Sequence, residues 1–436
     1  MRIGIDGYNL AMPHGTGVAT YGAELSNAVR GLGHELDGVF GLRVPKAEDA
    51  RETAFFDRFQ RPVDPRARVP RWVRRAEFAK TFLPTRLRHV PLSAAVEKRG
   101  LSDGWPGFDR LFSADNLFDR AHLWFRLTGR FVSLTLPDPP AIMHWTYPVP
   151  IQMVGARNIY TLHDLVPLKL PYATLDDKDV YRGVVQGCVR AAAHLCTVSE
   201  SSRADVIERF GVAENRISNT YQTAPRVTLG PLTDDQHAVE GIFGLPYRGY
   251  LLYFGAIEPK KNIGRIIEAY LSLQTTMPLV IVGARAWQSD SELRLMPGGG
   301  ADGSPGTFHG HRGQTIIRLQ YLPRELLTKL IRCARATVFP SVYEGFGLPV
   351  LESMQVGTPV ITSTTSSLPE VAGDAALFVD PYDVGAIVTA MRRIVDDGAM
   401  VEDLAARGLA SAKRFAPECY GKRLAAMYAR TMETAA

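Results

Sequence analysis

The sequence has few cysteines and no long apolar run, and these two features limit the kinds of protein that it can encode. Its four cysteines, Cys188, Cys196, Cys333 and Cys419, are scattered over 436 residues without paired spacing. Neither a disulfide framework nor a zinc site is therefore indicated. No apolar stretch reaches roughly 18 residues, and Met1–Asp6 begins directly with a strand rather than a charged and apolar leader. These absences predict a protein of the reducing cytoplasm that is neither exported nor membrane-spanning.

Charge is nearly balanced over the whole chain, with 50 basic and 45 acidic residues. One segment departs from this balance: between Arg66 and Arg99, arginine and lysine greatly outnumber Glu77 and Glu97 and are interleaved with apolar side chains. Two interpretations stay open, contact with an anionic membrane surface and the solvated face of a helical insertion. Nucleic-acid binding is disfavoured because no recognition motif accompanies the local excess of charge.

Short apolar runs alternate with helix-like segments, which predicts parallel sheets. In the first half a strand at Ile3–Ile5 precedes a helix at Thr20–Arg30. In the second half a strand at Tyr250–Phe254 precedes a helix at Ile263–Tyr270. Ligands bind at the carboxyl ends of the strands in such sheets, so the loops that follow these strands are the candidate site.

The most informative stretch is Tyr343–Thr358, in which seven residues, including a Gly-Phe-Gly-Leu-Pro turn, separate Glu344 from Glu352. An apolar strand precedes this stretch, and Pro349 suits the start of a helix because its missing N–H is not needed there. Such a junction presents free N–H groups and a helix dipole to a phosphate or a polarised hydroxyl. The two carboxylates can accept hydrogen bonds from a sugar and a ribose diol. Alone, the pair would be a helix cap and an ordinary exposed residue.

Two other loops carry candidate binding residues. Lys260 and Lys261 lie near a helix start, where a lysine opposes the helix dipole unless an anion is present. Gly15 and Gly17 follow the first strand, where paired glycines let the backbone approach a ligand closely. A plain turn explains the glycine pair equally well.

These motifs together resemble the donor site of family 4 glycosyltransferases. The matching segments share one order along the chain and are Thr161–Pro167, Thr197–Arg203, Arg209–Val212, Tyr253–Asn262, Ser341–Met354, Gly357–Ile361 and Ser367–Asp374. The resemblance covers residues 1 to about 30 and about 140 to 430. It implies an α/β protein of GT-B fold, with two Rossmann-like domains facing a central cleft and a helical, basic insertion in the first.

The same resemblance divides the chain into domains. Residues 1–228 are expected to form a Rossmann-like acceptor domain with an insertion at about 40–140. Residues 246–416 are expected to form the nucleotide-sugar donor domain, because proline and glycine interrupt any long element between about 226 and 248. The last helical stretch, 417–436, is expected to pack back on the first domain.

Residue roles follow from the matched positions. His163 would lie beside the transferred sugar with Asp164 as its orienting partner, and Lys261 would contact the donor diphosphate. Lys260 would compensate for Ala256, which stands where many family members carry an arginine. The candidate catalytic residues are thus His163, Glu344 and Lys261. The residues expected to bind the donor are Gly15, Gly17, Lys260, Lys261, Tyr321, Leu322, Gly345, Phe346, Gly347, Leu348 and Glu352.

No metal and no cofactor are expected, since the lysines and loop amides would stabilise the leaving diphosphate. Asp177-Lys-Asp179 matches a metal-binding Asp-x-Asp literally, but acids after a threonine here indicate a helix N-terminus. The Glu-Pro-Lys-Lys-Asn variant resembles a branch rich in mannosyltransferases, which favours GDP-mannose as the donor.

The resemblance therefore implies a retaining hexosyltransferase in the assembly of surface polysaccharide such as lipopolysaccharide. Its partners would be the nucleotide-sugar donor and a glycan or lipid-linked acceptor, with peripheral contact at the cytoplasmic face of the inner membrane. Two alternatives remain: an epimerase or hydrolase of nucleotide sugars on the same fold, and a non-catalytic nucleotide-sugar-binding scaffold.

Overall fold

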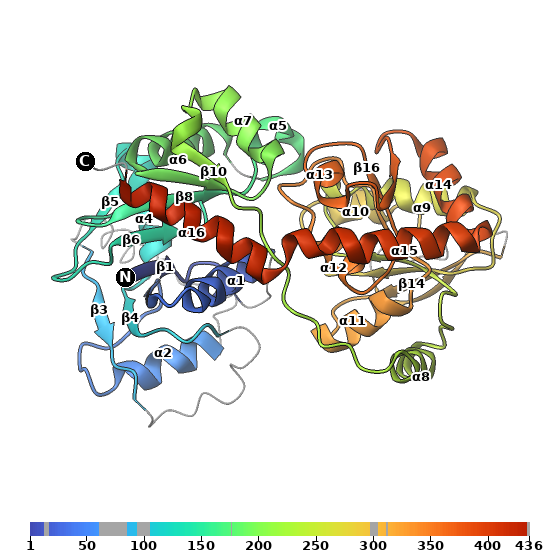
Figure 1. Ribbon diagram of the computed structural model, residues 1–436, viewed down its shortest axis with the longest axis horizontal. Coiled ribbons are helices and arrows are strands. Elements are labelled where there is room, and N and C mark those ends of the chain that lie inside the picture. The colour runs from blue at the N-terminus through green and yellow to red at the C-terminus, as the bar shows by residue number, and fades with distance from the viewer. Residues whose placement is uncertain are drawn as a thin grey trace.

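A computed structural model describes residues 1–12, 17–60, 85–93, 105–175, 177–296, 304–310 and 313–433. Two α/β units lie side by side, each built on a largely parallel sheet (Figure 1). The last helices, α15 (Gly398–Ala412) and α16 (Pro417–Glu433), run along the second unit and then across to the first (Figure 1). None of the helices in these ranges combines the length and apolarity needed to cross a membrane.

The first unit has a sheet of eight strands within the described ranges, all parallel except its antiparallel edge strand β3. In spatial order these strands are β10 (Ile217–Asn219), β9 (His194–Thr197), β8 (Arg157–Leu162), β6 (Ile142–Trp145), β1 (Arg2–Asp6), β2 (Glu35–Phe40), β4 (Arg110–Ser113) and β3 (Arg88–Val90). The helices of this unit used below are α1 (Gly17–Gly31), α2 (Arg51–Gln60), α4 (Leu117–Thr128), α5 (Val166–Lys169), α6 (Lys178–Ala191) and α7 (Glu200–Phe210).

The segment from about 40 to 140, expected as an insertion, contributes directly to this sheet. Strand β4 pairs in parallel with β2, and β3 completes the edge. Helix α2 packs its aromatic residues with Phe40, Trp105 and Phe108 in one buried cluster. Of the basic stretch between Arg66 and Arg99, only residues 85–93 lie within the described ranges, so both interpretations of its charge remain predictions.

The second unit has a seven-stranded sheet in the described ranges, with one antiparallel edge strand, β13. In spatial order its strands are β13 (Gly306–His309), β14 (Thr315–Leu319), β12 (Leu279–Val282), β11 (Leu251–Phe254), β15 (Ala336–Phe339), β16 (Val360–Ser363) and β17 (Ala376–Val379). Every residue of β11, β12, β15 and β16 is buried, as expected for parallel strands covered on both faces. The helices used below are α8 (Leu232–Phe243), α9 (Ile263–Ser272), α11 (Arg324–Cys333), α12 (Leu348–Gln355) and α13 (Leu368–Ala372).

Helix α16 is tied to the first unit by buried polar groups as well as by packing against α1. The Tyr428 hydroxyl lies 2.8 Å from Nδ1 of His144, and Nε2 of His144 lies 2.8 Å from the Thr161 hydroxyl. That hydroxyl lies 2.9 Å from the hydroxyl of Tyr21 on α1. Burial lowers the pKa of His144 to about 3, so its imidazole is neutral at neutral pH. The chain of hydrogen bonds therefore links α16 to α1 through two strands.

Replacing Tyr428 with phenylalanine should destabilise the protein, because a buried nitrogen of His144 would lose its partner. We expect a loss of about 1–3 kcal/mol in the free energy of unfolding. Tyr247→Phe serves as the control because Tyr247 is exposed to solvent. Thermal unfolding of both variants would measure the difference, and equal transition temperatures would contradict the structural importance of this link.

Candidate active site

The loop of residues 340–347 joins strand β15 to helix α12, in the order strand, glycine loop and helix. Gly347 caps the helix with a φ of 102°, and a Cβ there would lie 2.6 Å from Cδ2 of Leu368. Both the left-handed backbone and the tight packing require glycine at this position. Pro349 lies in the first turn of α12, where no N–H donor is needed.

Two neighbouring serines hold this loop in place: Ser367, which begins one of the segments that carry the family resemblance, and Ser366, which does not belong to any of them. The hydroxyl of Ser367 donates to the carbonyls of Glu344 and Phe346, at 2.9 Å each. The hydroxyl of Ser366 accepts a hydrogen bond of 2.9 Å from the N–H of Glu344. The backbone of the loop is therefore fixed from the segment that follows β16. Serine spacing alone carries no signal for such contacts between distant segments.

Glu344 and two lysines form a buried cluster of charges beside the loop. Nζ of Lys261 lies 2.6 Å from Oε1 of Glu344, whose side chain is only 9% exposed. Burial raises the pKa of Glu344, but the charges of Lys261 and Lys260 outweigh it and lower the pKa overall. Burial lowers the pKa of Lys260, but the carboxylates of Glu344, Asp164 and Glu258 outweigh it and raise the pKa overall. Glu344 is therefore ionised and Lys260 is cationic.

Asn262 places these lysines, a role that no pattern in the sequence indicated. Lys260 and Lys261 lie in a 3₁₀ turn, Pro259–Lys261, just before α9. Asn262 ends this turn at a φ of 66°, and its buried amide donates to the carbonyls of Pro340, at 3.0 Å, and Pro381, at 2.7 Å. Asparagine tolerates this left-handed conformation better than most residues. The loop after β11 is thereby locked to the loop after β15.

His163 follows strand β8 and is oriented by a backbone carbonyl. Its Nε2 lies 2.8 Å from the carbonyl oxygen of Thr146, which can only accept, so Nε2 carries a proton. Burial lowers the pKa of His163, which favours the neutral ring with Nδ1 as an acceptor. Oδ1 of Asp164, which was expected to orient this ring, accepts from the N–H of Val166 at 3.0 Å, while the charge of Asp164 partly opposes the lowering of the pKa of His163.

The two units touch where His163 meets the glycine loop. A Cβ on Gly345 would lie 2.4 Å from the carbonyl oxygen of His163, so only glycine fits this approach. The hydroxyl of Ser202 on α7 lies 2.7 Å from that oxygen and 3.3 Å from the carbonyl oxygen of Gly345. Nearby, the Glu370 carboxylate of α13 accepts from the first N–H groups of α7, at 2.9 and 3.0 Å. Loops of both units therefore share one site.

Glu352 and the segment after β14 form a second group of predicted residues. Oε1 of Glu352 lies 3.6 Å from a guanidinium nitrogen of Arg324, at the start of α11. Burial raises the pKa of Glu352, and the charge of Arg324 partly opposes this. Tyr321 is exposed, whereas Leu322 packs against the core of the second unit. Arg324 was not predicted from the sequence, although it follows the predicted residues Tyr321 and Leu322 by only two positions.

The remaining predicted positions are placed as follows. Gly17 begins α1 and faces α12, since a Cβ on it would lie 3.5 Å from Cδ1 of Leu348. Gly15 lies outside the described residues. Asp177 caps α6, accepting from the N–H groups of Asp179 and Val180 at 3.1 Å. Across the part of the chain that the structure describes, no three His, Cys, Asp or Glu side chains gather as a metal site.

Known proteins are similar to much of the chain. The family model "Glycosyl transferases group 1" matches residues 245–410. "O-antigen chain mannosyltransferase B" of Escherichia coli is 36% identical over 267 residues, which are 60% of this chain and 67% of that protein. "Serotype-specific mannosyltransferase WbdA" of Escherichia coli is 29% identical over 62% of this chain, which spans only 33% of that relative's length.

Solved structures share the arrangement of the two units. Sucrose-phosphate synthase from Thermosynechococcus elongatus superposes with a TM-score of 0.66 over 100% of both chains, at 17% identity. HepE from Anabaena, solved with UDP and glucose, superposes with a TM-score of 0.60 over 98% of this chain and 99% of its own, at 14% identity. At such low identities the likeness concerns the fold alone, and the predicted GT-B fold is confirmed.

Replacing Gly345 with alanine should force the two units apart, because the added methyl group would overlap a backbone oxygen of His163. We expect an increased radius of gyration by small-angle scattering and a destabilisation of about 1–3 kcal/mol. Gly398→Ala is a matched control, since a Cβ on Gly398 would meet nothing within 4 Å. Identical scattering and stability in the two variants would show that this contact does not hold the units together.

Proposed function

The chain belongs to the group 1 glycosyltransferases, and on this basis we propose that it transfers mannose from GDP-mannose to a glycan acceptor. Mannose is proposed because both relatives described above are mannosyltransferases. The O-antigen named for the first of them also supports an acceptor that belongs to a surface polysaccharide such as lipopolysaccharide. We place the reaction at the cytoplasmic face of the inner membrane, where a lipid-linked acceptor would be available.

The buried cluster of Lys260, Lys261 and Glu344 is the observation that carries this proposal. Breaking the bond between the anomeric carbon and the diphosphate places negative charge on the leaving group. Two lysines, one of them paired with a buried carboxylate, provide cations beside the N–H groups that begin α12. These groups would stabilise the departing diphosphate without a metal or another cofactor. The donor phosphate would then replace Glu344 as the partner of Lys261.

The groups around His163 suit the transferred sugar. With Nε2 bound to Thr146, the neutral imidazole directs Nδ1 as an acceptor for a sugar hydroxyl. Glu344, released from Lys261, would accept from other hydroxyls of the same sugar. Both side chains would hold the anomeric carbon in place rather than act as acid and base.

We propose that substitution occurs on one face of the sugar, so that the anomeric configuration is retained. The bond from the anomeric carbon to the diphosphate oxygen breaks, and a bond to the acceptor oxygen forms on the same side. The acceptor proton passes to the departing phosphate oxygen, so no protein base is required. The backbone contact between Gly345 and His163 would bring the diphosphate and the acceptor into one closed site.

The nucleoside would lie against the second group of residues. Glu352 on α12 would accept hydrogen bonds from the ribose diol, and the backbone of Tyr321 and Leu322 would contact the base. Arg324 acts between the units: its charge lowers the pKa of Glu24 on α1, which burial raises overall, and it also pairs with Glu352. A nucleotide bound at Glu352 would therefore lie near Arg324, whose charge acts on carboxylates of both units.

The first test is transfer from GDP-mannose and UDP-glucose to an oligomannoside in the presence of EDTA. We expect transfer of mannose from GDP-mannose that EDTA does not abolish. Free mannose without an acceptor product would indicate a hydrolase, and a changed sugar on the nucleotide would indicate an epimerase. Calorimetric binding of the nucleotide sugar without any turnover would instead support the non-catalytic scaffold.

Removing the charge of Lys261 should slow the chemical step more than it weakens donor binding. We expect Lys261→Met to lower kcat by about 10²–10³-fold, because the stabilisation grows as the diphosphate departs. The substitution also leaves the Glu344 carboxylate buried without its partner. The double variant Lys261→Met/Glu344→Gln should therefore recover stability but not activity. A normal kcat in the single variant would contradict the role of Lys261.

Glu352→Ala should weaken donor binding, since two hydrogen bonds from the ribose would lose a charged acceptor. We expect Kd for GDP-mannose to rise by about tenfold or more in calorimetric titration. Glu325→Ala on the neighbouring helix is the control, because Glu325 is exposed and forms its ion pair with Lys329 on the same helix. Unchanged affinity in Glu352→Ala would remove this residue from the nucleotide site.

A further inference from the structure

Aromatic rings follow the carboxyl edge of the first sheet, one after each of three neighbouring strands. His163 follows β8, Tyr147 comes soon after β6, and Tyr8 comes soon after β1. Because these strands are adjacent and parallel, their ends lie in a row at one edge. The centroids of His163 and Tyr147 lie 6.4 Å apart, and those of Tyr147 and Tyr8 also lie 6.4 Å apart.

The row continues into helix α4, which follows strand β4 in the same sheet. The ring of Phe118 lies 4.7 Å from that of Tyr8, centroid to centroid, with 37° between their planes. Three contacts therefore connect Phe118 to His163 in steps of 4.7 to 6.4 Å. Nothing in the chain order suggests such a row, because its members come from widely separated segments.

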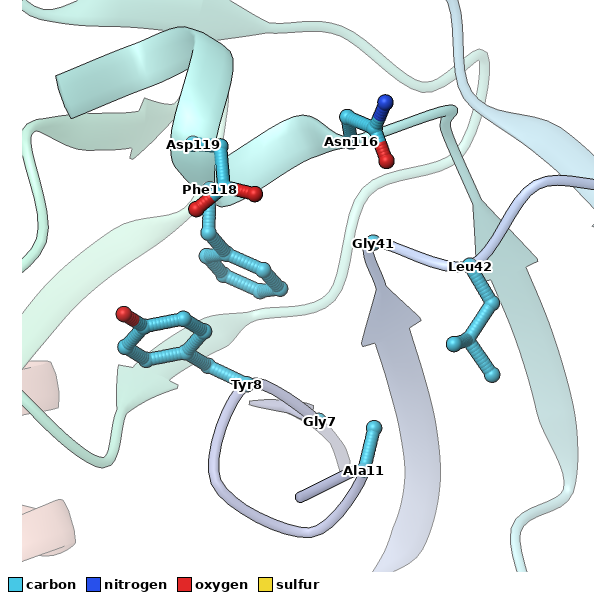
Figure 2. Close-up of a pocket in the computed structure, with 8 residues that line it drawn as sticks. All are labelled: Gly7, Tyr8, Ala11, Gly41, Leu42, Asn116, Phe118 and Asp119. Atoms are coloured by element: carbon cyan, nitrogen blue, oxygen red, sulfur yellow. The ribbon is translucent and has the colours of Figure 1, made fainter. Parts of the chain in front are cut away.

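A pocket lies at the end of this row that is farthest from His163 (Figure 2). Its walls come from the ends of β1 and β2 and from the start of α4, and its lining residues are Gly7, Tyr8, Ala11, Gly41, Leu42, Asn116, Phe118 and Asp119. It is a shallow pocket of about 140 Å³ that opens to solvent, so it could hold one face of a sugar ring without enclosing the whole ring.

The pocket combines an apolar wall with polar groups at its rim. Phe118 is 5% exposed, and a Cβ on Gly41 would lie 2.9 Å from its ring, so glycine at this position lets the ring close the wall. Asn116 and Asp119 are both exposed. Asp119 lines the pocket together with Tyr8 and Phe118, and Figure 2 draws all three side chains. A pyranose has matching chemistry, since it presents C–H groups on its faces and hydroxyls at its edge.

We propose that this row binds the acceptor glycan, with a pyranose of that glycan in the pocket formed by Tyr8, Phe118 and Asp119. This inference rests on the proposed function, which places the transferred sugar at His163. The hydroxyl that receives mannose would lie near His163 and Tyr147, and the pocket would bind a sugar farther along the same acceptor. The residues of the pocket would thereby set a preference for acceptors longer than one sugar.

The charge at the rim favours a neutral sugar over the phosphate of a lipid carrier. The carboxylate of Asp119 can accept hydrogen bonds from two hydroxyls, whereas it would repel a phosphate. The substitution Asp119→Asn would retain the shape of the side chain but remove its charge. Comparing wild type with this single variant therefore separates charge from shape in the recognition of the acceptor.

The test compares kcat/KM for methyl α-mannoside, α-mannobiose and α-mannotriose with GDP-mannose as the donor. We expect wild type to prefer the longer acceptors and Asp119→Asn and Tyr8→Leu to reduce that preference by about tenfold. Tyr8→Phe should keep it, because the ring remains. Asp234→Asn, at an exposed position on α8, is the matched control and should also keep the preference. An unchanged preference in Asp119→Asn and Tyr8→Leu would overturn the proposal.

A binding measurement separates failure of this site from failure of the proposed function. Saturation-transfer NMR with α-mannotriose alone, without a donor, should show binding to wild type that weakens in Asp119→Asn. If no sugar nucleotide supports transfer but this binding pattern holds, the proposed function fails and the glycan pocket stands. If the wild type transfers mannose but the Asp119→Asn variant binds α-mannotriose as tightly as the wild type does, the proposed glycan pocket is wrong. Because Asp119 is exposed, this variant keeps the test valid even if Tyr8→Leu fails to fold.

Discussion

The close approach of Gly345 to His163 is the constraint on which the rest of the site depends. A side chain at position 345 would overlap the carbonyl oxygen of His163, so the absence of one allows loops from two separate sheets to meet. Ser202 bridges the same two backbones, and Glu370 binds the start of α7 beside them. Because all these contacts join the first unit to the second, the site forms fully only when the units are together. The return of α16 to the first unit adds a second connection, through the hydroxyl of Tyr428 and the buried imidazole of His144.

The buried negative charge of Glu344 is balanced by a positive charge from the protein itself, that of Lys261. A buried carboxylate without a partner is strongly unfavourable, and Lys261 provides that partner for Glu344. In the proposed reaction a diphosphate takes over Lys261, while sugar hydroxyls satisfy the released carboxylate. The same two side chains thus stabilise the protein before the donor binds and recognise two parts of the donor afterwards. Lys260 remains cationic in both situations because several carboxylates surround it.

Local order in the sequence was sufficient to predict the two parallel sheets and the strand, glycine loop and helix at Glu344. It was insufficient wherever a side chain hydrogen-bonds to backbone groups that are distant in sequence. Asn262, Ser366 and Ser367 bind carbonyl or N–H groups of other loops, and no spacing along the chain reports such contacts. The hydrogen bond that orients the His163 ring goes to the carbonyl of Thr146, which is distant in sequence, whereas Oδ1 of the adjacent Asp164 accepts from the N–H of Val166.

The order of strands in the first sheet explains why an acceptor row could not be predicted from the chain. The edge runs from β8 through β6 and β1 to β2 and β4, so segments far apart in sequence become neighbours in space. His163 occupies the place where this edge meets the second unit, since its ring belongs to the aromatic row and its carbonyl approaches Gly345. The contact between the two units therefore holds the His163 end of the acceptor row against the donor loop. An acceptor that fills the row would favour the closed arrangement, so acceptor length and donor transfer would be physically coupled through His163.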